Sequence, residues 1–239
     1  TYLYFLGKVR GSFIDIAEAE ACRTSAIAKA HTKTLGLGTE SPIDLICKTS
    51  KFKLKSDKKE DVIKSLADNM QACWWKFGEG KFDFLSDLDF GSSDARCFIC
   101  SEISSEKFKG KILAGEFVNF LNTERLNNPL KKEKLTYSEY FKGEKGFSAS
   151  ADGAVDIDLN KSLYAVFIAN KKFSFDIPGG IRAGVGIVGA LKARVPTNVR
   201  AVLAAVVIGV VVAGHAPDFV SMVALANEDT IVNVCDTLE

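Results

Sequence analysis

The apolar residues near the start of the chain recur every three or four positions, a spacing that is typical of one face of a helix. These residues are Leu6, Val9, Phe13, Ile16, Ala17 and Cys22. We therefore predict a long N-terminal helix that runs to about Lys33 and stops before Gly36 and Gly38, because glycine disfavours the continuation of a helix.

A second stretch with helical spacing follows a polar start. Asp57 and Glu60 suit the first turn of a helix. The apolar positions that repeat at helical intervals after them are Val62, Ile63, Leu66, Met70, Cys73, Trp74 and Phe77. Gly78 closes this helix, and two further helices are predicted over residues 115–125 and 137–141.

Four segments have the composition or the alternation of β-strands. They cover residues 44–54, 96–103, 163–177 and 219–226, with turn-forming residues at 170–172 inside the third. Strands and helices follow one another without the regular rhythm of a parallel α/β sheet. We therefore predict an α+β fold in which a mostly antiparallel sheet is covered by helices.

Residues 201–214 form a fourteen-residue run without a charged residue, AVLAAVVIGVVVAG. Small residues recur in it at every fourth position, namely Ala201, Ala205, Gly209 and Ala213. In a helix they would form one smooth strip against which another helix can pack closely. The Gly-rich residues 179–191, which include Gly180 and Gly184, precede this run, with turn formers at 192–198 between the two. These two apolar segments and the turn between them predict an apolar helical hairpin near the C-terminus.

This hairpin could be buried in a membrane, in the core of its own chain or against other copies of the chain. A helix over residues 199–214 would be roughly 24 Å long, against about 30 Å for the hydrocarbon core of a membrane, so a single span is disfavoured. Burial in the chain's own core stays open, and so does a central β-strand, because seven of the fourteen residues are Val or Ile. We favour burial against other copies of the chain, because a helix that is apolar all round needs contacts on every side.

The composition fits one folded domain with appendages. Of the 239 residues 47% are hydrophobic and 26% are charged, and the net charge of +1 argues against nucleic acid as a partner. We divide the chain into an N-terminal helix or connector (1–35), an α+β domain (36–178 with 218–239) and the hairpin (179–217). The chain opens with TYLYFL and no Met, which suggests processing or the outer end of a removed membrane anchor.

Six cysteines are spread along the chain: Cys22, Cys47, Cys73, Cys97, Cys100 and Cys235. An even number dispersed in this way favours up to three disulfides in an exported protein, with fifteen possible pairings. Zinc is an alternative, because Cys97 and Cys100 form a CxxC to which Cys47 or Cys73 could add a thiolate. Reduced and buried cysteines are the third alternative.

The other motifs in the sequence do not indicate a nucleotide site, a calcium site or a catalytic site. Residues 184–189 spell GxGxxG, but no acidic residue follows about twenty positions later, as a dinucleotide site requires. Residues 156–160 begin like a calcium loop but lack its later Gly and Glu, and we interpret them as a solvated turn. Neither His31 nor His215 has a nucleophile and an acid at an interpretable spacing. We therefore predict no catalytic residue, no metal and no cofactor.

The segment CWWKFGEGK at residues 73–81, followed by the CxxC at residues 97–100, resembles a pattern in uncharacterised archaeal membrane-anchored proteins. These proteins also tend to carry a cysteine in the first helix, as Cys22 does here, and one near the C-terminus, as Cys235 does. The resemblance implies an anchored or exported archaeal surface protein. It brings no known activity and no catalytic residues.

The CWWKFGEGK segment has two interpretations. On helical spacing Trp74 lies on the apolar face and belongs to the core. In the competing interpretation Trp75, Phe77 and Glu79 form a ligand-contacting corner, for which the sequence offers no second component.

These features together predict a non-catalytic surface protein that self-assembles into a repetitive extracellular array, either a filament or a tube. The apolar hairpin and the N-terminal helix are the expected contacts, and copies of the same chain are the expected partners. Head-to-tail contacts that do not close into a ring propagate without limit. The alternative is a membrane-anchored binding module whose hairpin inserts into lipid.

Overall fold

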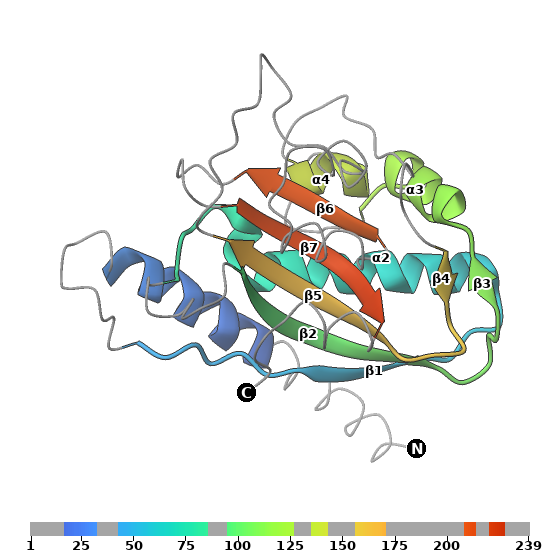
Figure 1. Cartoon of the computed structure of the whole chain (residues 1–239), viewed down its shortest axis with the longest axis horizontal. Coiled ribbons are helices and arrows are strands. Elements are labelled where there is room, and N and C mark those ends of the chain that lie inside the picture. The colour runs from blue at the N-terminus through green and yellow to red at the C-terminus, as the bar shows by residue number, and fades with distance from the viewer. Residues whose placement is uncertain are drawn as a thin grey trace, which may run out of the picture.

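The computed structural model describes residues 17–32, 43–85, 95–126, 135–142, 156–170, 208–213 and 220–227. The helices of this part are the N-terminal helix (residues 17–32), α2 (Lys59–Lys76), α3 (Ala114–Thr123), α4 (Tyr137–Lys142) and a short 3-10 helix, η1 (Gly78–Gly80). Its strands are β1 (Ser50–Leu54), β2 (Ala95–Ser105), β3 (Lys111–Ile112), β4 (Ile157–Asp158), β5 (Leu163–Asn170), β6 (Ile208–Ala213) and β7 (Val220–Asn227). Figure 1 shows the N-terminal helix in blue, beside the extended chain that leads into β1.

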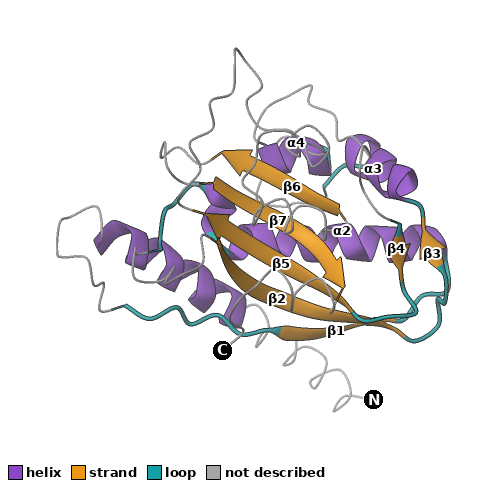
Figure 2. Cartoon of the chain, in the orientation of Figure 1, coloured by secondary structure: helices purple, strands orange, loops and turns teal. Residues whose placement is uncertain are grey.

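The main sheet has five strands in the order β1-β2-β5-β7-β6. β1 runs parallel to β2, and the other three neighbouring pairs are antiparallel. β3 and β4 form a separate two-stranded sheet. Figure 2 shows the five strands as one twisted layer with α2 behind it. The predicted α+β class, with a mostly antiparallel sheet packed against helices, is confirmed, and one of its pairings is parallel.

Helix α2 lies against one face of this sheet because its apolar residues share one side of the helix. The buried positions of α2 are Val62, Ile63, Leu66, Ala67, Met70, Cys73 and Trp74. They belong to one core cluster with Leu163, Ala165 and Phe167, which are alternate residues of β5. Alternate residues of a strand point to the same face. The apolar side of α2 therefore packs on the face of the sheet to which these alternate residues of β5 point.

Four phenylalanines close the core beyond the C-terminal end of α2. Phe77 stacks on Phe167, with ring centroids 4.6 Å apart, and its ring lies 5.0 Å from that of Phe98. The ring of Phe84 lies 5.6 Å from Phe77 and 5.9 Å from Phe167. Such separations are within the range of favourable ring contacts. Phe77 thus contacts all three of the other rings.

The described part of the N-terminal helix packs on the same core. Cys22, Ala26 and Ala30, each four residues apart, are buried in the core cluster. A disulfide joins Cys22 to Cys47, which lies in the extended segment before β1. The N-terminal helix is thereby confirmed over residues 17–32, and this part of it is tied to the α+β domain.

The predicted helical hairpin is wrong for the part of it that the structure describes. Residues Ile208–Ala213 form strand β6, which pairs antiparallel with β7. Gly209 lies opposite Ala224, and Ala213 lies opposite Val220, so these two small residues belong to a strand and not to a helical strip. The physical reason is composition, because four of the six residues of β6 are Val or Ile, whose branched Cβ favours strands.

Several other sequence predictions lie outside the described residues. They are the remainder of the hairpin (179–207 and 214–217), with Gly180, Gly184, Ala201 and Ala205, the GxGxxG residues 184–189, the end of the third predicted strand (171–177), Cys235 and His215. Within the part of the chain that the structure describes, no helix has both the length and the apolar character that a membrane span needs.

Candidate functional site

The two edges of the main sheet differ in charge. β1 carries Lys51 and Lys53, whose side chains are 84% and 63% exposed. Their Nζ atoms lie 3.9 Å from a carboxylate oxygen of Glu102 and 3.1 Å from one of Glu106, respectively. Lysine on an edge strand hinders pairing with another chain, because its charge would have to lose water. The β1 edge is therefore protected against the addition of a strand.

The strand at the opposite edge, β6, carries no lysine or other charged residue of its own. β6 has the sequence IGVVVA, without a charged residue, and among the described strands it pairs with β7 alone. In the view of Figure 1 it is the uppermost strand of the sheet. An edge strand presents a row of backbone N–H and C=O groups with which a further strand can pair. β6 is therefore the candidate functional site, an interface for strand addition, and it contains two of the predicted assembly residues, Gly209 and Ala213.

A second candidate lies where α2 ends, and we call it the Glu79 corner (Arg23, Trp75, Glu79, Lys81 and Tyr140). The Tyr140 hydroxyl donates a hydrogen bond to Oε1 of Glu79 at 2.8 Å, and Lys81 forms an ion pair with Oε2. Cζ of Arg23 lies 4.7 Å from the centroid of the Trp75 ring, and Arg23 also donates to the Trp75 carbonyl oxygen. The Glu79 corner therefore joins the N-terminal helix, the end of α2 and α4.

The backbone of the Glu79 corner explains the sequence GEG. Gly78, Glu79 and Gly80 have φ angles of 71°, 61° and 67°. A Cβ atom on Gly78 would lie 2.6 Å from the Phe82 ring, and one on Gly80 would lie 2.4 Å from the Trp74 ring. Glu79 is the one non-glycine residue with positive φ in the described part of the chain, a conformation that costs about 1–2 kcal/mol. The contacts of its carboxylate offset this cost.

The Glu79 corner is built as a junction between elements. Trp74 is 1% exposed, as its predicted core position requires, and Phe77 is equally buried within the aromatic cluster. The side chain of Glu79 is 11% exposed, and its two carboxylate oxygens contact Tyr140 and Lys81. The side chains of Trp75, Phe77 and Glu79, which the competing interpretation assigned to a ligand, thus contact other side chains of the chain itself.

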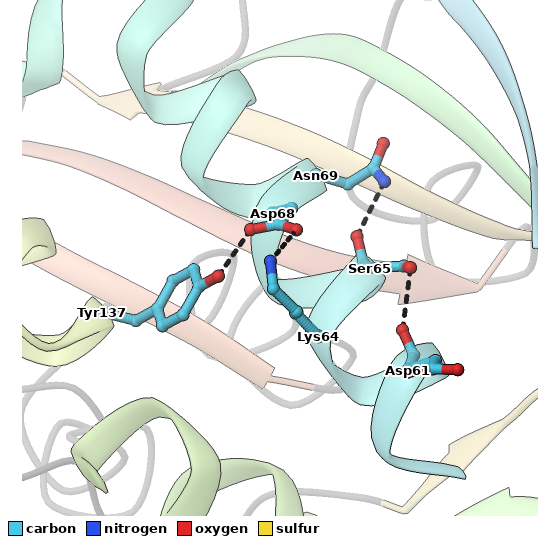
Figure 3. A network of polar contacts seen from close by, with 6 residues as sticks. All are labelled: Asp61, Lys64, Ser65, Asp68, Asn69 and Tyr137. Atoms are coloured by element: carbon cyan, nitrogen blue, oxygen red, sulfur yellow. Dashed lines mark hydrogen bonds and ion pairs between the residues drawn. The ribbon is translucent and has the colours of Figure 1, made fainter. Parts of the chain in front are cut away.

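A polar network on α2 fixes this helix against α4 and β2 (Figure 3). The Tyr137 hydroxyl donates to Oδ1 of Asp68, and Oδ2 of Asp68 lies 2.7 Å from Nζ of Lys64. Nδ2 of Asn69 donates to the backbone oxygen of Ser65 at 2.8 Å. Oδ1 of Asn69 accepts a hydrogen bond from Ser101 of β2 at 3.0 Å. The network therefore positions secondary-structure elements.

The two tyrosines of α4 make the stability of the fold sensitive to alkaline pH. Burial raises the pKa of Tyr137, and the adjacent Asp68 carboxylate raises it further. Burial and the Glu79 carboxylate likewise raise the pKa of Tyr140. An unfolded tyrosine ionises near pH ~10. The stability that the two neutral phenols contribute is therefore fully present below about pH 10 and is lost as the pH rises toward the folded-state pKa values.

We expect the free energy of unfolding to fall by about 1.4 kcal/mol per pH unit for each of these tyrosines above about pH 10. Urea unfolding at a series of alkaline pH values measures the slope. Tyr137→Phe and Tyr140→Phe should each make the slope shallower by about 1.4 kcal/mol per pH unit relative to the parent chain. Equal slopes in the parent and both variants would contradict this placement of the phenols.

The described cysteines are joined in disulfides. Cys22 pairs with Cys47 and Cys73 with Cys100, while Cys97 is also disulfide-bonded, to a partner outside the described residues. The prediction of disulfides is confirmed, and the CxxC does not close on itself. Because disulfide sulfurs are not thiolates, these cysteines do not supply the alternative zinc site. The disulfides indicate an oxidising, extracellular location.

In the segment that begins like a calcium loop, the side chains of Asp156 and Asp158 accept hydrogen bonds from backbone N–H groups of the same chain. Oδ1 of Asp156 accepts a hydrogen bond from the Ala114 N–H at the start of α3, at 3.0 Å. Oδ1 of Asp158 accepts from the backbone N–H of Asn160 at 3.0 Å and from its Nδ2 at 2.8 Å. These two hydrogen bonds, the backbone one foremost, lower the pKa of Asp158. The geometry agrees with a solvated turn, and no group of three His, Cys, Asp or Glu in the described ranges is arranged to hold a metal ion.

No protein-family model, curated protein or solved structure matches this chain.

Proposed function

We propose that this chain is a non-catalytic extracellular structural protein that associates with copies of itself through strand β6. The observation that carries the proposal is the contrast between the sheet edges, with lysines on β1 and an uncharged apolar strand at β6. Monomeric proteins usually protect their sheet edges with charges, bulges or covering segments. An apolar edge strand without charges is therefore suited to pairing with another chain.

The array expected from the sequence needs contacts of more than one kind. Pairing at β6 supplies one contact, in place of the helical hairpin. The second contact expected from the sequence is the N-terminal segment. Cys22, Ala26 and Ala30 are buried in the domain core, so this role would fall to the exposed side of residues 17–32 or to residues 1–16, which lie outside the described part of the chain. Electron microscopy of the purified protein tests for a filament or tube directly.

The alternative function is a membrane-anchored binding module. Insertion of residues 179–217 into lipid as a helical hairpin would require β6 to separate from β7 and to lose the pairing of its six residues. This cost favours contacts with protein over contacts with lipid. Flotation with liposomes distinguishes the two functions, because a lipid-inserted chain rises with the vesicles and a self-associating chain does not.

The proposal predicts that a charge on β6 weakens self-association. Val210→Lys and Val211→Lys place the charge on opposite faces of the strand, because successive strand residues point to opposite sides. Each variant is expected to associate about tenfold or more weakly than the parent chain, since a lysine charge near a paired edge loses water. Sedimentation equilibrium measures the association, and circular dichroism confirms that each variant is folded.

Phe52→Lys on β1 is the matched control, because Phe52 is 38% exposed and lies on the edge that already carries lysines. It is expected to associate like the parent chain. A parent chain that sediments as a monomer at about 1 mM, where an interaction of about 4 kcal/mol would already be half formed, would overturn the proposal whatever the variants do.

A further inference from the structure

We infer that residues 228–235, which we call the C-terminal strap, cross the face of the main sheet opposite α2 and are fastened there by a disulfide between Cys97 and Cys235. The strap follows β7 directly and lies outside the described residues. Three observations on described residues support this placement. They are the disulfide bond of Cys97, the burial of the second sheet face and the distance from the end of β7 to Cys97.

The partner of Cys97 follows from the number of cysteines in the chain. Cys97 is disulfide-bonded, and the described part of the chain holds no free cysteine. Four of the six cysteines in the sequence form the pairs Cys22–Cys47 and Cys73–Cys100. Cys235 is the one cysteine that remains for Cys97, and it is the last residue of the C-terminal strap.

The face of the sheet opposite α2 is buried, although the N-terminal helix, α2, α3 and α4 all contribute to the core on the α2 side. Successive strand residues point to opposite faces, and the second face holds the buried residues of β5 and β7 that do not belong to that core cluster. They are 0–5% exposed and comprise Val166, Ile168, Met222, Ala224 and Ala226. Cys97 shares this face, because it lies opposite Ile168 in the pairing of β2 with β5. Side chains this deeply buried need a cover from another part of the chain.

The length of the C-terminal strap matches the distance that it has to span. Asn227 at the end of β7 lies opposite Leu163 of β5, and Cys97 of β2 lies opposite Ile168, on the other side of β5. The Cα atoms of Asn227 and Cys97 are therefore about 10 Å apart across the sheet and about 17 Å along it, or roughly 20 Å in all. From Asn227 to Cys235 an extended chain reaches about 26–29 Å but a helix only about 12 Å, to which a disulfide adds about 5.5 Å. An extended strap reaches Cys97, and a helical one does not.

The composition of the strap suits the face that it crosses. Its sequence, EDTIVNVC, contains the apolar residues Ile231, Val232 and Val234. The direct route from the end of β7 to Cys97 passes over Ala224 and Ala226, whose small side chains allow a close approach to the sheet. A segment of the same chain thus accounts for the burial of this face, which is then not available to a partner molecule.

A disulfide map of the parent chain tests the covalent link. Trypsin leaves Cys97 and Cys100 on one peptide, because no lysine or arginine lies between them, whereas chymotrypsin cuts after Phe98 and separates the two. Mass spectrometry of the non-reduced digest should find the Cys97 peptide joined to the Cys235 peptide, and the undigested protein should migrate at the 25.9 kDa of one chain without reductant. A free Cys97, a link from Cys97 to any other cysteine or a covalent dimer would overturn the inference.

The two methionines of the chain report separately on the two faces of the sheet. Met70 of α2 is 0% exposed in the core, and Met222 of β7 is 5% exposed on the opposite face. Hydrogen peroxide oxidises a methionine at a rate that depends on how often the structure opens around it. In the variant Cys97→Ala, Cys235→Ala the strap is no longer fastened, so Met222 should be oxidised about tenfold faster than in the parent chain, or more, while the rate at Met70 stays the same. Peptide mass spectrometry measures both rates.

The variant Cys22→Ala, Cys47→Ala is the matched control, because it removes a disulfide that fastens the N-terminal helix instead. Its Met222 should be oxidised as slowly as in the parent chain. An unchanged Met222 rate in the Cys97→Ala, Cys235→Ala variant would show that another segment covers the face, contrary to the inference. Equal acceleration at Met70 and Met222 in that variant would show that the disulfide holds the whole domain together and does not fasten a segment to one face, which would also overturn the inference.

Discussion

Replacing Phe77 with alanine is expected to lower the free energy of unfolding by about 3–5 kcal/mol, the range for removing a large aromatic side chain from a packed core. Phe77 is 1% exposed and contacts the rings of Phe84, Phe98 and Phe167. These rings come from a loop and from two different strands, so they cannot all move into the vacated space. Urea unfolding followed by the fluorescence of Trp74 and Trp75 measures the loss, because the Trp74 ring lies 5.8 Å from that of Phe167.

The matched control is Phe52→Ala, because Phe52 is 38% exposed on the edge strand β1. A substitution at such a position is expected to cost less than about 1 kcal/mol. Comparable losses for the two alanine variants would contradict the placement of Phe77 at the centre of the core. A variant Phe77→Leu, which keeps most of the volume, should recover a large part of the lost stability.

Helix α2 could be predicted from the sequence because the residues that specify its start, its end and its apolar face all lie within or next to the helix itself. The polar start at Asp57 and Glu60 and the stop at Gly78 bracket a helix that the structure places at Lys59–Lys76. The buried face repeats at the helical period, since it packs on a single sheet face along its whole length. The same holds for α3 and α4, whose observed bounds differ from the predicted ones by one or two residues.

Strand β6 was mistaken for part of a helix because a spacing of four residues does not distinguish the two structures. Residues i and i+4 lie on the same side of a helix, and they also lie on the same face of a strand, where the period is two. The small residues Gly209 and Ala213 are therefore compatible with either. The abundance of Val and Ile in the run was the better signal, because β-branched side chains favour strands.

The pairing of the cysteines and the contacts of the Glu79 corner could not be predicted, because they depend on how distant segments pack. Cys73 meets Cys100 only once α2 lies against β2, and the two residues are 27 positions apart in the chain. Tyr140 meets Glu79 across 61 positions. The strands β3 and β4 have two residues each, too few to show an alternating pattern.

Removing the disulfide between Cys73 and Cys100 by replacing both residues with alanine is expected to lower the free energy of unfolding by about 3.5 kcal/mol, the loop-closure value for a separation of 27 residues. The two residues are replaced together so that neither thiol can exchange with the neighbouring Cys97. Both lie in the core, at 0% and 3% exposure, and connect the middle of the domain, α2 to β2. We therefore expect the loss to appear in the global unfolding transition, measured with urea under non-reducing conditions.

The disulfide between Cys22 and Cys47 is the matched comparison, because its separation of 25 residues gives nearly the same entropy estimate but it holds a different part of the fold. It fastens residues 17–32 to the segment before β1, outside the α2–sheet interface. Hydrogen exchange of the Cys22→Ala, Cys47→Ala variant should lose protection in residues 17–32 first, while α2 and β5 keep theirs. The Cys73→Ala, Cys100→Ala variant should lose protection in α2, β2 and β5 together. Identical exchange patterns in the two variants would show that the N-terminal helix and the α2–sheet core unfold as a single unit, contrary to this expectation.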